Sequence, residues 1–230
     1  MELFLTVVSG LAWTIVYVEA IRVGLAQRTY AMPVAALALN FAWESIYSVR
    51  ELSQGLSAQG AVNVVWALAD VVIIHTFLRH GRAEFPAFVT RARFAVGSAV
   101  LFGSAYAVQL LFLAHFGGHD AVRYSAFLQN LLMSGLFIAM LLARRGPRGQ
   151  SLTIAVAKWL GTLAPTLLFG VMEGSGFILG LGILCSVFDL AYIAALLALR
   201  RNPDALTSPA SPTSVTSHPV GTVSATPRPS

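Results

Sequence analysis

The chain has 230 residues, of which 57% are apolar and only 11% charged, and its mean hydropathy is +0.73. Soluble domains carry about 25% charged residues, so this composition excludes an ordinary soluble protein and indicates one that crosses a membrane several times. The formal net charge is +5. Because the basic residues lie in connections on one side of the predicted membrane, we expect no nucleic-acid partner.

Seven apolar segments follow one another along the chain, each close to the length that a bilayer requires. Backbone groups in lipid must be satisfied within the segment, and the alternating pattern of a membrane strand is absent, so each segment predicts a helix. They span approximately residues 3–23, 32–49, 61–78, 94–116, 122–143, 152–171 and 177–199. The predicted fold class is therefore an all-α membrane protein, a seven-transmembrane-helix bundle formed as one domain by residues 1–201.

The connections between these helices differ in charge, which predicts the orientation in the membrane. The first, third and fifth connections and the end of the last helix hold Arg22, Arg28, Arg79, Arg82, Arg91, Arg93, Arg144, Arg145, Arg148, Arg200 and Arg201. The second and fourth connections hold only Arg50 and Arg123, and the sixth holds none. Basic residues stay on the cytoplasmic side, so we expect the N-terminus outside and the C-terminus in the cytoplasm.

The two ends of the chain differ in composition. The N-terminal segment lacks a basic region before its apolar run and is predicted to be a permanent helix rather than a removed signal peptide. Residues 202–230 are rich in Pro, Ser and Thr and are predicted to be a disordered tail. Arginine far outnumbers lysine and alanine is abundant, which favours a bacterial source, and hence the cell membrane for this multi-pass protein.

Three acids, Glu44, Asp70 and Asp189, fall well inside predicted membrane segments, where a charge costs at least about 3 kcal/mol. Glu19 lies nearer the cytoplasmic end and is expected to have a structural role. Lys158 is the only lysine, and we expect its long side chain to reach the cytoplasmic interface. The three acids would then lack a buried cation. Burial and mutual repulsion favour the neutral form, so at least one could donate a proton.

Helical spacing brings polar residues onto shared faces. Asn40 and Glu44 are four residues apart on the second predicted helix, and Asn63, Trp66 and Asp70 form a stripe on the third. On the seventh, the polar face comprises Cys185, Ser186, Asp189 and Tyr192. Polar faces of membrane helices point into the bundle, so we expect these to converge on one internal cavity. The aromatic residues expected near the acids are Trp43, Tyr47, Trp66, Phe188 and Tyr192.

Several motifs are missing from the sequence. There is no DDxxD cluster for a magnesium-bound diphosphate, no DxDD motif, no P-loop and no GxSxG elbow. His115 and His119 have helical spacing, but the two glycines between them favour an extramembrane loop over a metal site. Cys185 is the only cysteine, so no intramolecular disulfide forms. We expect neither a metal nor a cofactor.

The stretches NFAWE, WALAD and FDLAY, on the second, third and seventh predicted helices, resemble the small integral-membrane terpene cyclases of meroterpenoid and indole-diterpene biosynthesis. The resemblance covers approximately residues 3–199. It implies cyclisation of a prenyl chain that is already attached to another scaffold. It also implies that Glu44 and Asp189 are needed for activity, and Asp70 matches a third acidic position.

The resemblance implies a class II-like cyclase of isomerase or lyase type, which protonates the terminal alkene, or opens the epoxide, of a farnesyl-type chain on an aromatic or indole scaffold. Glu44 would be the acid, and Asp189 would reload its proton, with Asp70 sharing that role or orienting Glu44. Asn40 and the aromatic residues would bind substrate and stabilise carbocations. No diphosphate leaves, so no metal is needed. The expected partners are the prenylated substrate and the lipid bilayer, with no obligate protein partner.

Two other functions are compatible with the composition. A seven-helix proton-coupled transporter would also use membrane acids, but the sequence shows no repeated three-helix unit and no matching Pro-Gln pair in its halves. A non-catalytic membrane scaffold remains the third alternative. A retinal protein is excluded because the last predicted helix has no lysine.

Overall fold

The structure is a computed structural model that describes residues 1–55 and 57–202. Within these residues every regular element is a helix and there is no strand, which confirms the all-α fold class. From residue 203 onward, the predicted disordered tail lies outside the described residues.

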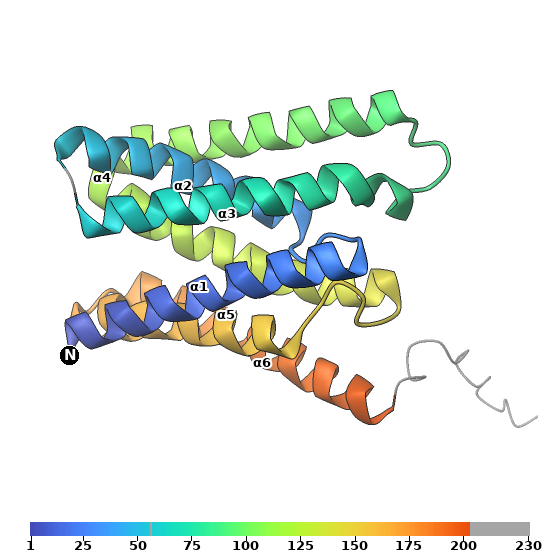
Figure 1. The fold of residues 1–230 in the computed structure, drawn as a ribbon. Helices are drawn as coiled ribbons and strands as arrows, with labels where there is room; N and C mark the ends of the chain where they lie inside the picture. The colour runs from blue at the N-terminus through green and yellow to red at the C-terminus, as the bar shows by residue number, and fades with distance from the viewer. Residues whose placement is uncertain (56, 203–230) are drawn as a thin grey trace, which may run out of the picture.

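The helices lie side by side along one long axis (Figure 1). They are α1 (Glu2–Gln27), α2 (Val34–Gln54), α3 (Ala58–His80), α4 (Arg91–Arg144), α5 (Leu152–Pro165) and α6 (Gly176–Arg201). A short 3₁₀ helix, η1 (Gly81–Glu84), follows α3, and a π-helix, η2 (Thr166–Met172), continues α5. α2 packs against α3 and α4, and α1 packs against α3 and α5, while α6 closes the bundle against α4 and α5.

Helix α4 has 54 residues and contains one break. At Gly117 the backbone has φ 72° and ψ 178°, a conformation that glycine adopts most readily because it has no Cβ. The chain turns back there, so the second arm (118–144) runs back in the opposite direction to the first arm (91–116) (Figure 1). Gln109 Nε2 donates across the two arms to Gln129 Oε1 at 2.8 Å.

The break at Gly117 corrects one prediction and leaves another open. His115 and His119 lie in helical turns on either side of this residue, so the chain around them is helical and not the expected loop. Their place outside the membrane stays a prediction. A single glycine with a positive φ is enough to reverse the chain. The described residues form six α-helices, and the number of seven membrane spans stays a prediction.

Five helical segments are long and apolar enough to cross a membrane by length and composition. They are Glu2–Gln27, Gln59–Glu84, Arg91–Arg144, Leu152–Met172 and Gly176–Arg201. α2 is not among them, because Glu44, Arg50 and Glu51 lower its hydropathy. Large apolar side chains such as Val65, Leu111 and Val187 are exposed on the outer surface of the bundle, as expected for contact with lipid. The chain is a multi-pass membrane protein.

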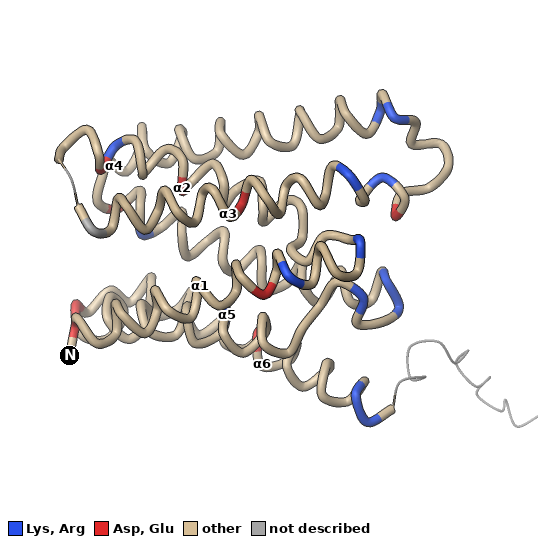
Figure 2. The backbone as a smooth tube through the Cα atoms, in the orientation of Figure 1, with Lys and Arg blue, Asp and Glu red and all other residues tan. Residues whose placement is uncertain are grey.

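Most basic residues gather at the end of the bundle opposite the N-terminus (Figure 2). There Arg144 ties three connections together: its guanidinium pairs with Glu84 at 2.8 Å, stacks 4.3 Å above the ring of Tyr30 and donates to the Thr29 hydroxyl at 3.2 Å. The connections with predicted basic clusters therefore lie on one side. Which side of the membrane this is stays a prediction.

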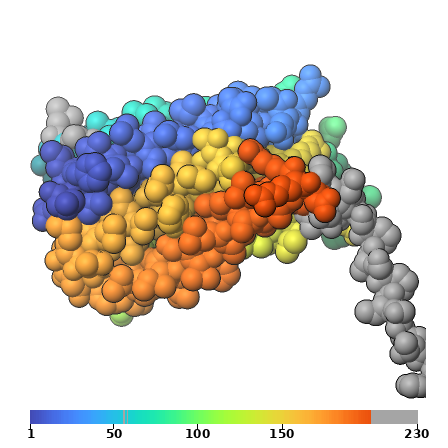
Figure 3. Space-filling view, turned by 90° about the horizontal axis from the view of Figure 1, so that it is seen from below, coloured from blue at the N-terminus to red at the C-terminus, as the bar shows by residue number. Residues whose placement is uncertain are grey.

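α1, the α5–η2 segment and α6 lie next to one another on one face of the molecule (Figure 3). Two glycines allow their close approach. A Cβ on Gly161 would lie 2.9 Å from the Trp13 ring, and one on Gly182 would lie 2.2 Å from the Thr166 side chain. The Trp13 ring, carried by α1, therefore packs against the backbone of α5 at Gly161 and forms part of the wall of an internal cavity.

Candidate active site

A cavity of about 940 Å³ lies between α1, α2, α3, the second arm of α4 and the α5–η2 segment. The exposed residues of its wall include four polar side chains at helix ends: Thr6 near the start of α1, Gln54 at the end of α2, Gln59 at the start of α3 and His119 just after the break in α4. These helix ends meet at the end of the bundle that holds the N-terminus, so the cavity opens there (Figure 1).

Glu44 lines this cavity and is 2% exposed. It sits in the middle of α2, where its neighbours Ala38, Ala42 and Ser48 are also buried. The hydroxyl of Tyr17, on α1, donates a short hydrogen bond to Glu44 Oε1. The carboxyl group is therefore fixed from a second helix rather than free to rotate.

Asn40, one turn before Glu44, connects it to α3. The side-chain amide nitrogen of Asn40 lies 3.0 Å from Glu44 Oε1, 2.9 Å from Asp70 Oδ2 and 2.5 Å from the Tyr17 hydroxyl. Gln129 Nε2, on α4, donates to Asn40 Oδ1 at 3.3 Å, which fixes the direction of the amide. An amide nitrogen carries two hydrogens and here faces three acceptors, so the group is short of donors unless a carboxyl supplies its own proton.

Two oxygens of this cluster are unpartnered. Glu44 Oε2 and Asp70 Oδ1 are buried and have no hydrogen-bond partner within residues 1–55 and 57–202. None of the ion pairs in that part of the chain includes either acid. Two carboxyls that share one donor in a buried site favour the retention of a proton between them. The same residues contain no group of three or more His, Cys, Asp or Glu side chains suited to a metal ion.

Aromatic rings surround the acid. Tyr17 stacks on Trp66 with ring centroids 5.8 Å apart, and Trp13 lies 6.5 Å from Tyr17. Trp43 and Tyr47 form a tilted pair at 5.0 Å on α2, and Trp43 Nε1 donates to the Val122 carbonyl at 3.1 Å. Three of the predicted substrate-binding aromatics therefore line the cavity together, namely Trp43, Tyr47 and Trp66.

Asp189 does not join this cluster, which corrects the predicted convergence of three acids. Its two carboxylate oxygens lie 2.9 and 3.0 Å from Lys158 Nζ, and Lys158 also donates to Ser134 Oγ at 2.7 Å. Lys158 is fully buried and does not reach the interface as expected. It points from α5 toward α4 and α6, where a carboxylate offsets the cost of burying its charge. Asp189 is therefore paired with a cation away from the cavity.

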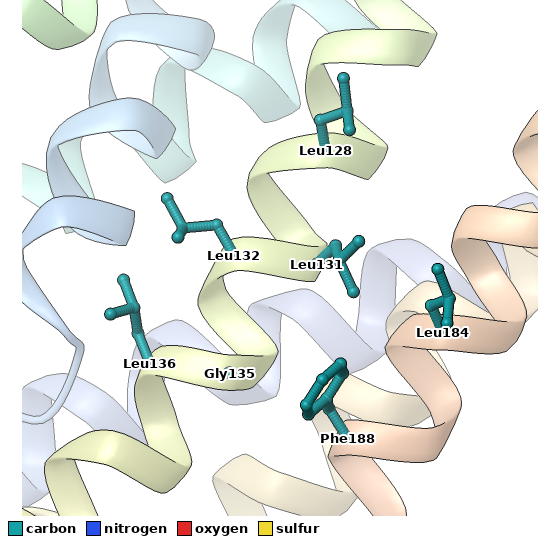
Figure 4. Close-up of a pocket in the computed structure, with 7 residues that line it drawn as sticks. All are labelled: Leu128, Leu131, Leu132, Gly135, Leu136, Leu184 and Phe188. Carbon is teal, nitrogen blue, oxygen red and sulfur yellow. The ribbon is translucent and has the colours of Figure 1, made fainter.

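Phe188 and Tyr192, the two aromatic residues of α6 that were expected near the acids, do not line the cavity. Phe188 faces the second arm of α4 in a separate groove of about 440 Å³, lined only by apolar residues and Gly135 (Figure 4). Tyr192 is buried in the core, where it stacks on Phe137 at 5.3 Å and donates to Gln150 Oε1 at 2.6 Å. The face of α6 that carries Asp189 thus turns toward α4 and α5.

Three residues of the site, Tyr17, Trp13 and Gln129, are not among those predicted from the sequence. Trp13 and Tyr17 are four residues apart on α1, a spacing that marks one face of a helix, but nothing in the sequence shows that this face meets Glu44. Glu19, by contrast, pairs with Arg22 at 2.6 Å and is not among the residues that line the cavity, and its structural role stays a prediction.

Comparison with known proteins shows what this chain is similar to. A family model described as Pyr4-like transmembrane terpene cyclases matches residues 1–172. The terpene cyclase pyr4 of Aspergillus fumigatus is 29% identical over an alignment of 203 positions that covers 84% of each chain. The terpene cyclase ascF of Acremonium egyptiacum is 30% identical over 67% of this chain and 61% of its own length.

A third relative, the Pyr4-family terpene cyclase mfmH of Annulohypoxylon moriforme, is 27% identical over 72% of this chain and 68% of its own length. These relatives are fungal and give no support to the predicted bacterial source or cell membrane. No solved structure matches the chain.

Proposed function

The chain belongs to the Pyr4-like transmembrane terpene cyclases, and from that premise we propose that it cyclises a farnesyl-type chain carried by an aromatic scaffold, starting with proton donation from Glu44. The observation that carries this proposal is the state of Glu44: a buried carboxyl in a cavity of about 940 Å³, with one oxygen fixed by Tyr17 and the other unpartnered. A general acid beside a cavity needs one oxygen that no other hydrogen bond occupies, because that oxygen must carry and transfer the proton.

The first step forms a C–H bond and breaks an O–H bond. The proton on Glu44 Oε2 is transferred to the terminal alkene, which leaves a tertiary carbocation on the chain and a carboxylate on Glu44. Successive ring closures move the positive charge along the chain, and loss of a proton to a carboxylate ends the reaction, so the product is an isomer. With a terminal epoxide, the same proton opens the ring and the product carries a hydroxyl group.

Asp70, on α3, is the second acid of this site and is linked to Glu44 through Asn40. Both acids accept from the amide of Asn40, at 3.0 and 2.9 Å, so Asn40 links the two carboxyls, and in the neutral pair each carboxyl holds its own proton. After proton transfer the pair carries a negative charge close to the developing carbocation, which stabilises it. The neutral form of the pair is the resting state, because no cation is paired with either acid among the described residues.

The cavity aromatics complete the site. Trp13, Trp43 and Trp66 present indole rings, which attract cations more strongly than other aromatic side chains. Their rings also limit the access of water, which would otherwise capture the carbocation before ring closure. Asp189 takes no part in this scheme: we assign it to the buried ion pair with Lys158. In the orientation predicted from the arginines, the cavity opens at the outer face of the membrane.

The test is a turnover assay on the full chain in microsomes. Farnesylated phenols and indoles, with and without a terminal epoxide, are incubated with these membranes and with membranes from cells that lack the protein. We expect a cyclic isomer from the alkene, or a cyclic alcohol from the epoxide, identified by mass spectrometry and NMR. Absence of any cyclic product, with the protein present in the membrane, would contradict the proposal and direct attention to transport.

Tyr17→Phe tests the hydrogen bond to Glu44 Oε1. The phenol stabilises the carboxylate that remains after proton transfer, and hydrogen bonds to charged groups contribute about 1.5–3 kcal/mol. We expect kcat to fall about 10- to 100-fold with little change in KM. Unchanged kcat would show that Tyr17 only packs against Trp66, and Trp66→Phe, which keeps an aromatic ring in the stack, is the matched comparison.

A further inference from the structure

We propose that Arg50, at the mouth of the cavity, binds an acidic oxygen of the scaffold that carries the prenyl chain, such as a phenolate, an enolate or a carboxylate. The inference rests on the proposed cyclase function and deepens it, because it selects among scaffolds. It assigns Arg50 as a specificity-determining residue for the polar end of the substrate.

Arg50 shares a helix face with the cavity residues Tyr47 and Gln54, at a spacing of three and four residues. It follows Glu44 by six residues, a rise of about 9 Å along α2. This separation is shorter than an extended farnesyl chain. A substrate that contacts both residues must therefore fold its chain within the cavity, as ring closure requires.

The Arg50 guanidinium is held in position by the break in α4. A Cβ placed on Gly118 would lie 1.9 Å from Nη2 and 2.6 Å from Cζ of Arg50, so the guanidinium packs directly on the backbone of Gly118. Arg50 itself is partly buried. The cation thus stands at a fixed place in the cavity wall rather than extending into solvent.

The guanidinium of Arg50 has no hydrogen bond or ion pair with any residue in the described ranges 1–55 and 57–202. The other arginine in the cavity wall differs: Arg123 forms a bidentate ion pair with Glu173 and lies 4.1 Å from the centre of the Phe169 ring. Arg123 is neutralised within the protein, and Arg50 is free to bind a ligand.

Two other titratable groups lie at the mouth, and each is engaged elsewhere. Glu51 accepts a hydrogen bond from Ser57 Oγ at 2.9 Å, at the connection between α2 and α3. His119 lies 3.5 Å from the Asp120 carboxylate on its own helix. The positive charge of Arg50 is therefore not cancelled by a direct partner on any neighbouring element.

A guanidinium is a planar donor of hydrogen bonds and binds anionic oxygens in a bidentate manner. An indole N–H is also a donor and offers the guanidinium no anionic oxygen to bind. The geometry therefore favours a scaffold with an acidic oxygen over a plain indole. A phospholipid phosphate offers the same chemistry at the end of a membrane bundle, so the test must separate these two sources.

The experiment compares a farnesylated phenolic acid with its fully O-methylated analogue, using the full chain in an uncharged detergent and in microsomes. Binding is followed by quenching of the cavity tryptophans, and turnover by product formation. For the wild type we expect tighter binding and a lower KM for the acid, by about 10- to 100-fold. In Arg50→Gln this preference should disappear while turnover of the methylated analogue stays, and Arg50→Lys should restore part of the preference.

Arg79→Gln is the matched control, since it removes one positive charge from an exposed position at the other end of α3. A preference for the acid that survives in Arg50→Gln would overturn the inference, and so would an equal loss of binding for both ligands, which indicates a structural role at Gly118. The wild type could instead show no preference for the acid in detergent, with Arg50→Gln changing only the binding of lipid. That result would assign the site to a phospholipid phosphate. Selective binding without turnover would contradict the cyclase proposal and leave this inference standing.

Discussion

Glu44→Gln is expected to reduce turnover by about 10²- to 10⁴-fold, the usual contribution of a general acid. Glutamine keeps the size of the side chain and can accept the hydrogen bonds from Tyr17 and Asn40, so the cavity keeps its shape. It has no acidic proton to transfer to an alkene. The measurement is product formation in microsomes, normalised to the amount of protein in the membrane.

The loss should be smaller for a substrate with a terminal epoxide, because opening a strained ring requires a weaker acid than protonating an alkene. Glu19→Gln is the matched control, since Glu19 pairs with Arg22 and does not line the cavity. It should keep most of the activity. Normal turnover in Glu44→Gln would exclude Glu44 as the acid.

Asp189→Asn is expected to lower the free energy of unfolding by about 3–5 kcal/mol, because it leaves the buried ammonium of Lys158 without a counter-charge. The loss should appear as a lower unfolding temperature in detergent and a lower yield of folded protein. The double variant Lys158→Met/Asp189→Leu should recover most of that stability, since an apolar pair of similar volume removes the desolvation cost of both ions.

Ser134→Ala is the control for this prediction. It removes one hydrogen bond to Lys158 and leaves the ion pair, so it should cost only about 1–3 kcal/mol. Loss of turnover in an Asp189→Asn protein with unchanged stability would give Asp189 a part in the chemistry and contradict the assignment. Recovery of turnover in the double variant would strongly support a structural role.

The sequence predicted the helical segments and the polar face of α2 well, because apolar length and four-residue spacing are local properties. Asn40 and Glu44 share a face in any α-helix, and their contact at 3.0 Å follows from that spacing. Asp70 lies near this face because α3 follows α2 directly in the chain and packs against it.

Contacts between distant helices were not predictable in this way. Periodicity identifies a polar face on α6 but not the helix that it meets, and Lys158 is placed to bind Asp189 only because α5 and α6 pack side by side. Lys158 lies in the middle of α5, and its ammonium group is buried in the bundle and does not extend to the end of the helix. The break at Gly117 was also hidden, because two glycines in a row suggest a loop while one positive φ is enough to reverse the chain.

The separation of the buried polar residues into two clusters has a consequence for the evolution of the family. No hydrogen bond in the described residues joins the ion pair of α5 and α6 to the cluster around Glu44. Substitutions at two sites without shared partners have nearly additive effects on free energy. Residues of the cavity wall can therefore be substituted one at a time, which changes the ring pattern that the cavity guides, without loss of the stability that the ion pair provides. A fold built in this way can diversify its products while its frame stays constant.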